Sequence, residues 1–192
     1  MQKNMKFRAL KKKISKLEEK LVHQQQKLAE LKHRLPLVEV IDYELSGPTG
    51  AVKLSALFNG KKDLIVVHNM GTTCRYCTMW ADGFNGLVSH LSNRAGFAIV
   101  SPDAPKTQQA FAQKRGWKFP MYSGRGSSFI EDMGFKSEDG WMPGVSTFVR
   151  KGKKIYRVAS APFGPFDSFC ATWPLFALLA GGADNWEPQY RY

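Results

Sequence analysis

Two cysteines separated by two residues are the strongest chemical feature of the sequence. Cys74 and Cys77 end the segment Gly71-Thr-Thr-Cys-Arg-Tyr-Cys77, which lies between a run typical of a buried strand and a segment with helical apolar spacing. At a helix N-terminus, free N–H groups and the helix dipole favour a thiolate over a thiol. We therefore predict that Cys74 is the nucleophile of thiol–disulfide exchange. Cys77, one helical turn away, would attack the resulting mixed disulfide.

Several neighbouring side chains are candidates for the rest of the site. His68 lies six residues before Cys74 and is a hypothetical proton acceptor for Cys77, with a core histidine as the alternative. Arg75 adds a cation beside Cys74, although exposure to solvent would screen it. Asp82 and Trp117 could also shape the rim. The predicted rim residues are Thr73, Arg75, Tyr76, Trp80, Pro143 and Gly144, with a core role left open for the tryptophans.

The same cysteines support two other functions. In a thiol peroxidase, Cys74 would attack a hydroperoxide, with Thr72 or Thr73 and an arginine around the peroxide oxygens. In a metal-binding or assembly module, Cys74, Cys77 and His68 would hold copper or zinc, but the sequence has no second Cys-x-x-Cys to complete a four-ligand zinc site. Cys170 is expected to be a buried core thiol, His90 a surface residue, and no cofactor is predicted.

Composition and charge limit the class of protein. A length of 192 residues with 43% apolar and 23% charged residues indicates one folded domain with an appendage. Three cysteines are too few for a disulfide framework, and no secretory signal or membrane span is recognisable, so we expect a cytoplasmic protein. Residues 1–35 carry eleven Lys and Arg against three Glu, which accounts for most of the net charge of +12.

That basic N-terminal segment is predicted to be one long helix. Residues 4–35 contain no Gly or Pro, and their apolar residues recur at alternating three- and four-residue steps, with Gln24 at the one interrupted position. Pro36 should end the helix. Two interpretations remain open: an arm that forms a homodimer, or an amphipathic helix folded back on the domain. Binding of nucleic acid or of a membrane is not expected, because Lys and Arg ordinarily solvate the outer face of such helices.

The elements after Pro36 must position the cysteine pair. Residues 37–45 alternate like a strand, 47–50 predict a turn, 54–58 a helical turn, and 64–67 a buried central strand. A helix over 75–91, a strand over 97–101 and a helix over 105–115 follow the order of a βαβ unit. A hairpin over 145–158 and a helix over 166–180 complete a thioredoxin-like order. The predicted fold is thus α/β and thioredoxin-like, a central mixed sheet flanked by helices, over residues 36–192, with a separate helix over 1–35.

From about Leu31 onward, four segments resemble a thioredoxin-like family of predicted dithiol–disulfide oxidoreductases, once catalogued only as a domain of unknown function. The segments are Leu35–Val40, Cys74–Gly86, Arg115–Pro120 and Pro143–Ser146. The string Trp80-Ala-Asp-Gly-Phe-Asn-Gly86 after the cysteine pair is the most specific of them.

The resemblance implies a thioredoxin fold and a dithiol site that acts on a protein or small-molecule disulfide, with a reductase as a possible partner. Thioredoxins carry an acid where this sequence has His68, so the proton route differs. Their cis-proline has Pro143 as its sole counterpart here, one or two residues early. The segment Gly50–Phe58, followed by Gly60 and Lys61, is more similar to the peroxidase and membrane-anchored reductase branch than to minimal thioredoxin.

Overall fold

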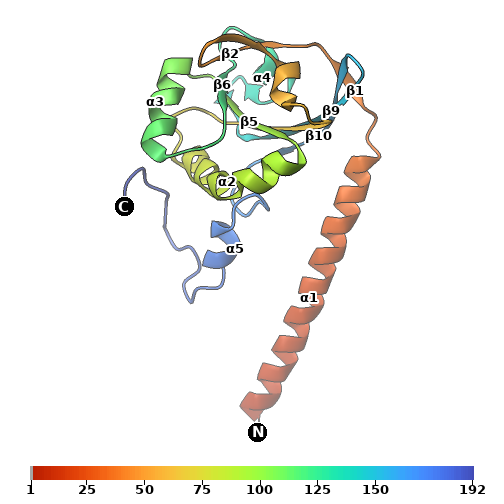
Figure 1. Cartoon of the computed structure of the whole chain (residues 1–192). Coiled ribbons are helices and arrows are strands. Elements are labelled where there is room, and N and C mark those ends of the chain that lie inside the picture. The colour runs from red at the N-terminus through yellow and green to blue at the C-terminus, as the bar shows by residue number, and fades with distance from the viewer. Residues whose placement is uncertain (1) are drawn as a thin grey trace. The chain divides into compact units, whose positions relative to one another are not determined.

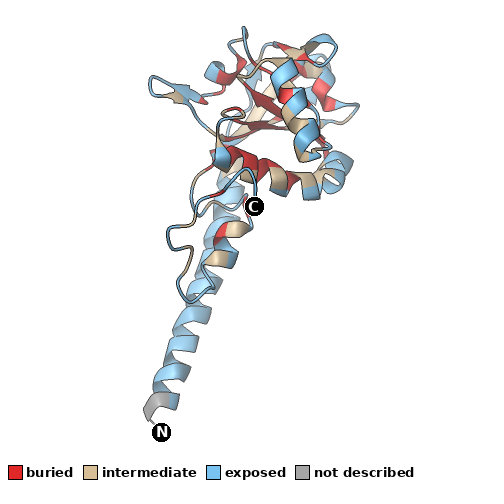
Figure 2. Ribbon diagram, turned by 90° about the vertical axis from the view of Figure 1, so that its left-hand side faces the viewer, coloured by how far each residue is buried: buried red, intermediate tan, exposed pale blue. Residues whose placement is uncertain are grey.

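The computed structural model describes residues 2–192, with side chains from residue 4, and divides into two compact units, Met1–Pro36 and Leu37–Tyr192. The first unit is the helix α1 (Gln2–His33), as predicted. The apolar residues of its heptad pattern are 45 to 59% exposed, so their covering by a second copy or by the same chain stays a prediction. Figure 2 shows α1 exposed along its length, in contrast to the strands of the second unit.

The second unit is built on an eight-stranded mixed sheet with the order β1-β10-β9-β4-β5-β6-β2-β3 (Figure 1). The strand β4 is central: it runs parallel to β5, which is parallel to β6, and antiparallel to β9. A small separate ribbon pairs β7 (Lys136–Ser137) with β8 (Gly140–Trp141). The main strands are β1 (Val38–Val40), β2 (Glu44–Gly47), β3 (Gly50–Lys53), β4 (Asp63–His68), β5 (Gly96–Ser101), β6 (Met121–Ser123), β9 (Gly144–Lys151) and β10 (Lys154–Pro162).

Alternation along the strands divides the apolar side chains between the two faces of the sheet. On one face, Leu64 and Val66 pack with residues of the 3-10 helix η1 (Leu54–Phe58) and of α4 (Phe129–Asp132). On the other face, Val67 packs with residues of α2 (Arg75–Arg94) and with Trp173 of α5 (Thr172–Phe176). The helix α3 (Pro105–Arg115) begins at its proline and ends at Gly116, whose φ is 67°. The helix that carries the cysteines therefore follows a strand whose last three residues, Val66 to His68, are buried.

Two predicted elements are wrong in extent. The strand over 37–45 is two strands at different places in the sheet, because the carboxylate of Asp42 accepts hydrogen bonds from the N–H and the hydroxyl of Ser55 at 2.8 and 2.7 Å and turns the chain out. The helix over 166–180 is reduced to α5, because Pro174 is tolerated only in the first turn of a helix. Upstream of it, Asp167 accepts the N–H of Phe169 at 2.7 Å in a turn.

The remaining predicted elements are confirmed with small shifts of their ends. The hairpin turn at residues 47–50 joins β2 and β3, and η1, β4, α2, β5, α3, β9 and β10 all occur where they were expected. The strands β3, β6, β7 and β8 and the helix α4 were not predicted. No helix among the described residues has the length and the apolar character that crossing a membrane requires.

A glycine at the start of β9 gives a test of this packing. A Cβ on Gly144 would collide with the Phe135 ring and lie 2.6 Å from the carbonyl oxygen of Ala161, whereas a Cβ on Gly86, in the exposed face of α2, would meet nothing. We expect Gly144→Ala to lower the free energy of unfolding by about 1 to 3 kcal/mol. Gly86→Ala should raise it by up to about 1 kcal/mol. Urea denaturation measures both, and equal effects of the two substitutions would contradict the packing described.

Candidate active site

The loop between β4 and α2 is held by hydrogen bonds to the neighbouring strand and its loop. The N–H of Asn69 donates to the carbonyl of Val100 at 2.9 Å, and the Asn69 side chain accepts the N–H of Gly71 at 2.8 Å. Asp103 accepts the N–H of Thr72 at 2.6 Å. A Cβ on Gly71, whose φ is 107°, would lie 2.9 Å from that carboxylate. A glycine is therefore required where the chain passes over the carboxyl ends of two parallel strands.

Cys74 is the N-cap residue of α2. Its backbone is extended, with φ of −94° and ψ of 106°, and its sulfur accepts the N–H of Cys77 at 3.0 Å. Its carbonyl accepts both the N–H and the hydroxyl of Thr78, at 3.1 and 3.0 Å. Sulfur thus takes the place that a serine or aspartate oxygen commonly holds at a helix start, where an anion is stabilised by free N–H groups.

These contacts lower the pKa of the Cys74 thiol to about 7. The largest cause is the hydrogen bond that the Cys77 thiol donates to the Cys74 sulfur. Partial burial opposes it, and the N–H groups of Cys77 and Tyr76 add to it. Near neutral pH, a substantial fraction of Cys74 is therefore thiolate, which is the reactive form of cysteine.

Cys77 has the opposite character. It is 2% exposed, and its hydrogen bond to Cys74, its burial and the charge on Cys74 all raise the pKa of its thiol. The N–H of Met70, 3.5 Å from its sulfur, partly offsets these effects. Both cysteines are free thiols in the structure. The pair therefore holds one readily lost proton, on Cys74, and one retained proton, on Cys77.

The structure gives His68 partners other than the cysteines. Its Nε2 lies 2.9 Å from the hydroxyl of Ser146, and its ring stacks on Phe135 with centroids 4.0 Å apart. Phe135 belongs to the cluster on the face of the sheet opposite α2. Burial, and secondarily the charge of Arg157, lower the pKa of His68 to about 3. These features argue for the core histidine that the sequence left as the alternative, and against a proton acceptor for Cys77.

The metal-binding alternative also lacks support. No group of three or more His, Cys, Asp or Glu side chains in the described part of the chain is arranged to hold a metal ion. Cys74 and Cys77 lie together, but His68 does not join them as a third ligand. Cys170 is buried in the cluster under α2, as expected for a core thiol.

The predicted rim residues have different environments. Thr73 is an exposed turn residue, and Arg75 forms an ion pair with Glu187 at 2.8 Å. Tyr76 is half-buried, with its ring 6.5 Å from that of Trp80 and 6.2 Å from that of Trp173. Trp80 itself is 4% exposed. It therefore belongs to the core and not to the rim.

Pro143 and Gly144 lie beside the end of the strand that leads to the cysteines. Gly144 pairs with His68 in the β4–β9 ladder, and the carbonyl of Pro143 accepts the N–H of Phe163 at 2.9 Å. No cis peptide bond occurs among the described residues, so Met142 and Pro143 are joined by a trans bond. The site is built without the cis-proline of thioredoxins.

Asp82 joins α2 to the end of α3. Its carboxylate accepts the indole N–H of Trp117 at 2.8 Å and forms an ion pair with Arg115. Arg115 also donates to the carbonyl of Tyr190 at 2.7 Å. Asp82 therefore positions residues beside the site.

The segment 186–192 was not predicted to take part in the site. Glu187 binds Arg75 in the first turn of α2, Pro188 is fully buried, and Tyr190 is bound by Arg115. Burial, and then the charge on Cys74, raise the pKa of Tyr190. Its phenol is thus within electrostatic reach of the nucleophile. The sequence signal for this contact was weak: one Trp, one Pro and two Tyr in an otherwise irregular segment.

Comparisons with known proteins agree on the fold. Residues 1–191 match the family model described as "Bacterial protein of unknown function (DUF899)". No curated protein matches the sequence.

Among solved structures, the chain is similar to thioredoxin-fold peroxiredoxins. A structure of Xanthomonas campestris peroxiredoxin Q is 21% identical, with a TM-score of 0.55, covering 68% of this chain and 87% of that one. Peroxidoxin BcpB of Mycobacterium tuberculosis is 24% identical, with a TM-score of 0.53, covering 65% and 82%. The X. campestris bacterioferritin comigratory protein, in a study of its alkyl peroxide reduction, is 20% identical, with a TM-score of 0.53, covering 62% and 79%. The predicted thioredoxin-like fold is confirmed.

The hydrogen bond between the thiols predicts a pH dependence of alkylation. Because the pKa of Cys74 is lowered to about 7, its reaction with iodoacetamide should rise with a midpoint near pH 7. Cys77→Ala removes the donated hydrogen bond, so the midpoint should move upward toward the ordinary range of cysteine. Mass spectrometry of the Cys74 peptide over a pH series measures this, with Cys170→Ala as the control. An unchanged midpoint in Cys77→Ala would contradict the thiol–thiol hydrogen bond.

Buried His68 predicts a loss of stability in acid. Its pKa falls from 6.5 to about 3 on folding, so below pH 6.5 the unfolded chain binds a proton that the folded chain does not. Stability should therefore fall as the pH is lowered from 6.5 to 5, with His68 contributing about 1.5 kcal/mol. His68→Gln, which keeps a partner for Ser146, should lose that contribution, whereas exposed His90→Gln should not. Urea denaturation at pH 6.5 and pH 5 measures the free energy of unfolding. If His68→Gln shows the same change between the two pH values as the wild type, the assigned role of His68 is wrong.

Proposed function

This chain belongs to the bacterial family of unknown function DUF899, and we propose that it is a thiol–disulfide oxidoreductase that works through Cys74 and Cys77. The observation that carries the proposal is the capping of α2 by the Cys74 sulfur, which accepts the N–H of Cys77 at 3.0 Å. One nucleophile is thereby ionised near neutral pH, and a second thiol is held within reach of it.

In the first step, the Cys74 thiolate attacks one sulfur of a substrate disulfide. A bond forms between Cys74 and that sulfur, and the other substrate sulfur leaves as a thiolate that takes a proton from solvent. Cys74 is partly exposed, as contact with a substrate requires. The product of this step is a mixed disulfide between Cys74 and half of the substrate.

In the second step, Cys77 resolves the mixed disulfide. Once Cys74 is bonded to substrate it carries no charge, so two of the three causes that raise the pKa of Cys77 are removed and only burial remains. The N–H of Met70 then stabilises the developing thiolate. Attack of Cys77 on the Cys74 sulfur releases the substrate as a thiol and leaves an intramolecular disulfide.

Turnover requires an external dithiol to reduce the Cys74–Cys77 disulfide. We propose that a cytoplasmic reductase or small dithiol supplies these two electrons, since thiols are kept reduced in that compartment. The oxidised substrate is a protein or a small-molecule disulfide.

Thiol peroxidase activity is the second candidate, and the similarity of the fold to peroxiredoxins favours it. The Cys74 thiolate would attack a hydroperoxide oxygen, release an alkoxide that takes up a proton, and become a sulfenic acid. Cys77 would then condense with it and release water. Two of the arginines near the site form ion pairs, Arg75 with Glu187 and Arg115 with Asp82, and no arginine contacts the Cys74 sulfur in any hydrogen bond of the described residues. Disulfide exchange needs no such cation and is therefore the function we prefer.

One experiment tests the proposal against its rival. Reduction of insulin disulfides by dithiothreitol, followed as insulin precipitation, is compared with consumption of tert-butyl hydroperoxide under the same conditions. We expect the wild type to accelerate insulin reduction far more than peroxide consumption. Cys74→Ser should abolish the acceleration, and Cys170→Ala, the matched control, should retain it. Cys77→Ser should accumulate a mixed disulfide on Cys74 that mass spectrometry detects.

Other results of the same experiment would contradict the proposed function. If the oxidised wild type contains no Cys74–Cys77 disulfide, or if Cys74→Ser retains activity, the dithiol mechanism is wrong. If peroxide is consumed rapidly and insulin is not reduced, the peroxidase is the function.

A further inference from the structure

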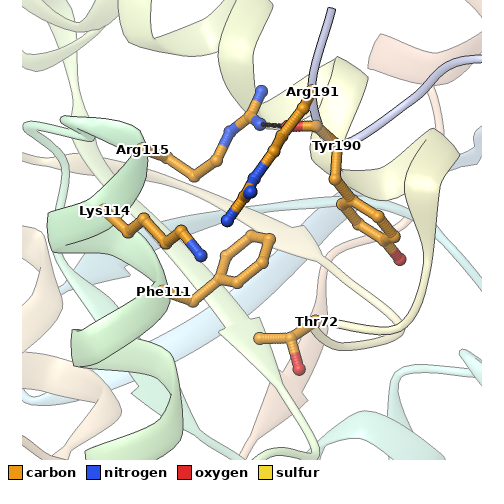
Figure 3. Close-up of a pocket in the computed structure, with 6 residues that line it drawn as sticks. All are labelled: Thr72, Phe111, Lys114, Arg115, Tyr190 and Arg191. Atoms are coloured by element: carbon orange, nitrogen blue, oxygen red, sulfur yellow. Dashed lines mark hydrogen bonds between the residues drawn. The ribbon is translucent and has the colours of Figure 1, made fainter.

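A cavity of about 500 Å³ opens beside the loop that leads to Cys74. It is formed between the N-terminal loop of α2, the end of α3 and the segment 186–192, as Figure 3 shows. Its lining residues are Thr72, Phe111, Lys114, Arg115, Tyr190 and Arg191.

The charge of this cavity is entirely positive. Three of its lining residues are cations and none is acidic. Arg115 is occupied by Asp82 and by the carbonyl of Tyr190. Lys114 and Arg191 form no ion pair with any residue from 4 to 192, and in Figure 3 their charged ends converge near the ring of Phe111. Two cations without counter-charges, brought together, attract an anion.

The cavity also has apolar walls. The rings of Phe111 and Tyr190 meet edge to face with centroids 6.3 Å apart. A ligand that fits combines a short apolar body, in contact with these rings, with an anionic group that reaches Lys114 and Arg191. A carboxylate on a short aliphatic chain has this chemistry.

The cavity lies close to the nucleophile, although Cys74 does not line it. Thr72, two residues before Cys74, lines it. Tyr190 lines it as well, and the charge on Cys74 contributes to the raised pKa of this phenol. A ligand bound here therefore lies beside the reacting sulfur.

Packing holds the segment that supplies Tyr190 and Arg191. Trp186 packs edge to face on Phe176 with centroids 4.8 Å apart, and Pro188 is fully buried. Glu187 is bound to Arg75 at 2.8 Å. The backbone that leads to Tyr190 and Arg191 is thus held by contacts of Trp186, Glu187 and Pro188.

We propose that this cavity is a substrate subsite that selects small disulfides carrying a carboxylate, with Lys114 and Arg191 binding the carboxylate. The inference rests on the proposed function, since it names the substrate class of the same cysteine pair. The bound disulfide presents its sulfur to Cys74 while its charged end stays in the cavity.

Three symmetric disulfides of similar size test the selection: 3,3′-dithiodipropionate with two carboxylates, neutral 2-hydroxyethyl disulfide, and cystamine with two ammonium groups. Each rate of reaction with the reduced wild type is divided by its rate with 2-mercaptoethanol, which corrects for intrinsic reactivity. We expect the corrected rate for the dianion to exceed that for the neutral disulfide by about tenfold and that for cystamine by more. The ratio should shrink in high salt.

In the double variant Lys114→Gln/Arg191→Gln, the corrected rate for the dianion should be close to that for the neutral disulfide. Lys106→Gln, on the same helix but outside the cavity, should keep the wild-type ratio. A wild type without preference for the dianion, or a double variant that keeps the preference, would overturn the subsite and leave the disulfide chemistry intact.

Alkylation tests the subsite independently of disulfide exchange. The ratio of the Cys74 alkylation rates with anionic iodoacetate and neutral iodoacetamide should exceed the same ratio for 2-mercaptoethanol, and should fall to it in the double variant. If no disulfide reacts with the wild type but this ratio behaves as expected, the proposed function fails and the anion subsite stands. A wild-type ratio equal to that of the free thiol would refute the subsite.

Discussion

The capping of α2 by the Cys74 sulfur, which accepts the N–H of Cys77 at 3.0 Å, is the interaction on which the proposed chemistry depends. The pKa of the Cys74 thiol is lowered because the Cys77 thiol retains its proton and stabilises the Cys74 thiolate as a hydrogen-bond donor. This arrangement requires a rigid helix start, which the buried strand β4 and the Asp103 contact to Thr72 provide. The buried core under α2 thus holds the first turn of the helix rigid, so that the N–H of Cys77 stays within hydrogen-bonding distance of the Cys74 sulfur.

In the proposed mechanism, no side chain acts as a dedicated base that accepts the proton of Cys77. His68 occupies the sequence position where such a base was expected, but burial keeps it neutral and its ring stacks with Phe135 on the other face of the sheet. In the proposed mechanism, the mixed disulfide removes the anion that holds the proton on Cys77. The proposed order of the two steps follows from electrostatics, since Cys77 would become reactive only after Cys74 has reacted.

Local features of the sequence predicted the pair well, because a helix cap and a Cys-x-x-Cys spacing involve only neighbouring residues. The buried β4, the boundaries of α3 at Pro105 and Gly116, and the β9–β10 hairpin were predictable for the same reason. The division of residues 37–45 into two strands was not, because it depends on a contact between Asp42 and a residue 13 positions away. The side-chain direction of His68 was not predictable either, since either face of a buried strand accepts apolar rings.

The least predictable part of the site is also the part that distinguishes it from a bare dithiol. The segment 186–192 reaches the site through an ion pair between residues 112 positions apart, Arg75 and Glu187, and no periodic pattern encodes such a contact. Any thiol chemistry started by Cys74 uses the same helix cap, whether the acceptor is a disulfide or a peroxide. What differs is the group placed beside the sulfur, and here that group is a cation-lined cavity closed by Tyr190 and Arg191. The acidity of Cys74 thus depends on local structure, whereas the proposed choice of substrate depends on long-range packing around it.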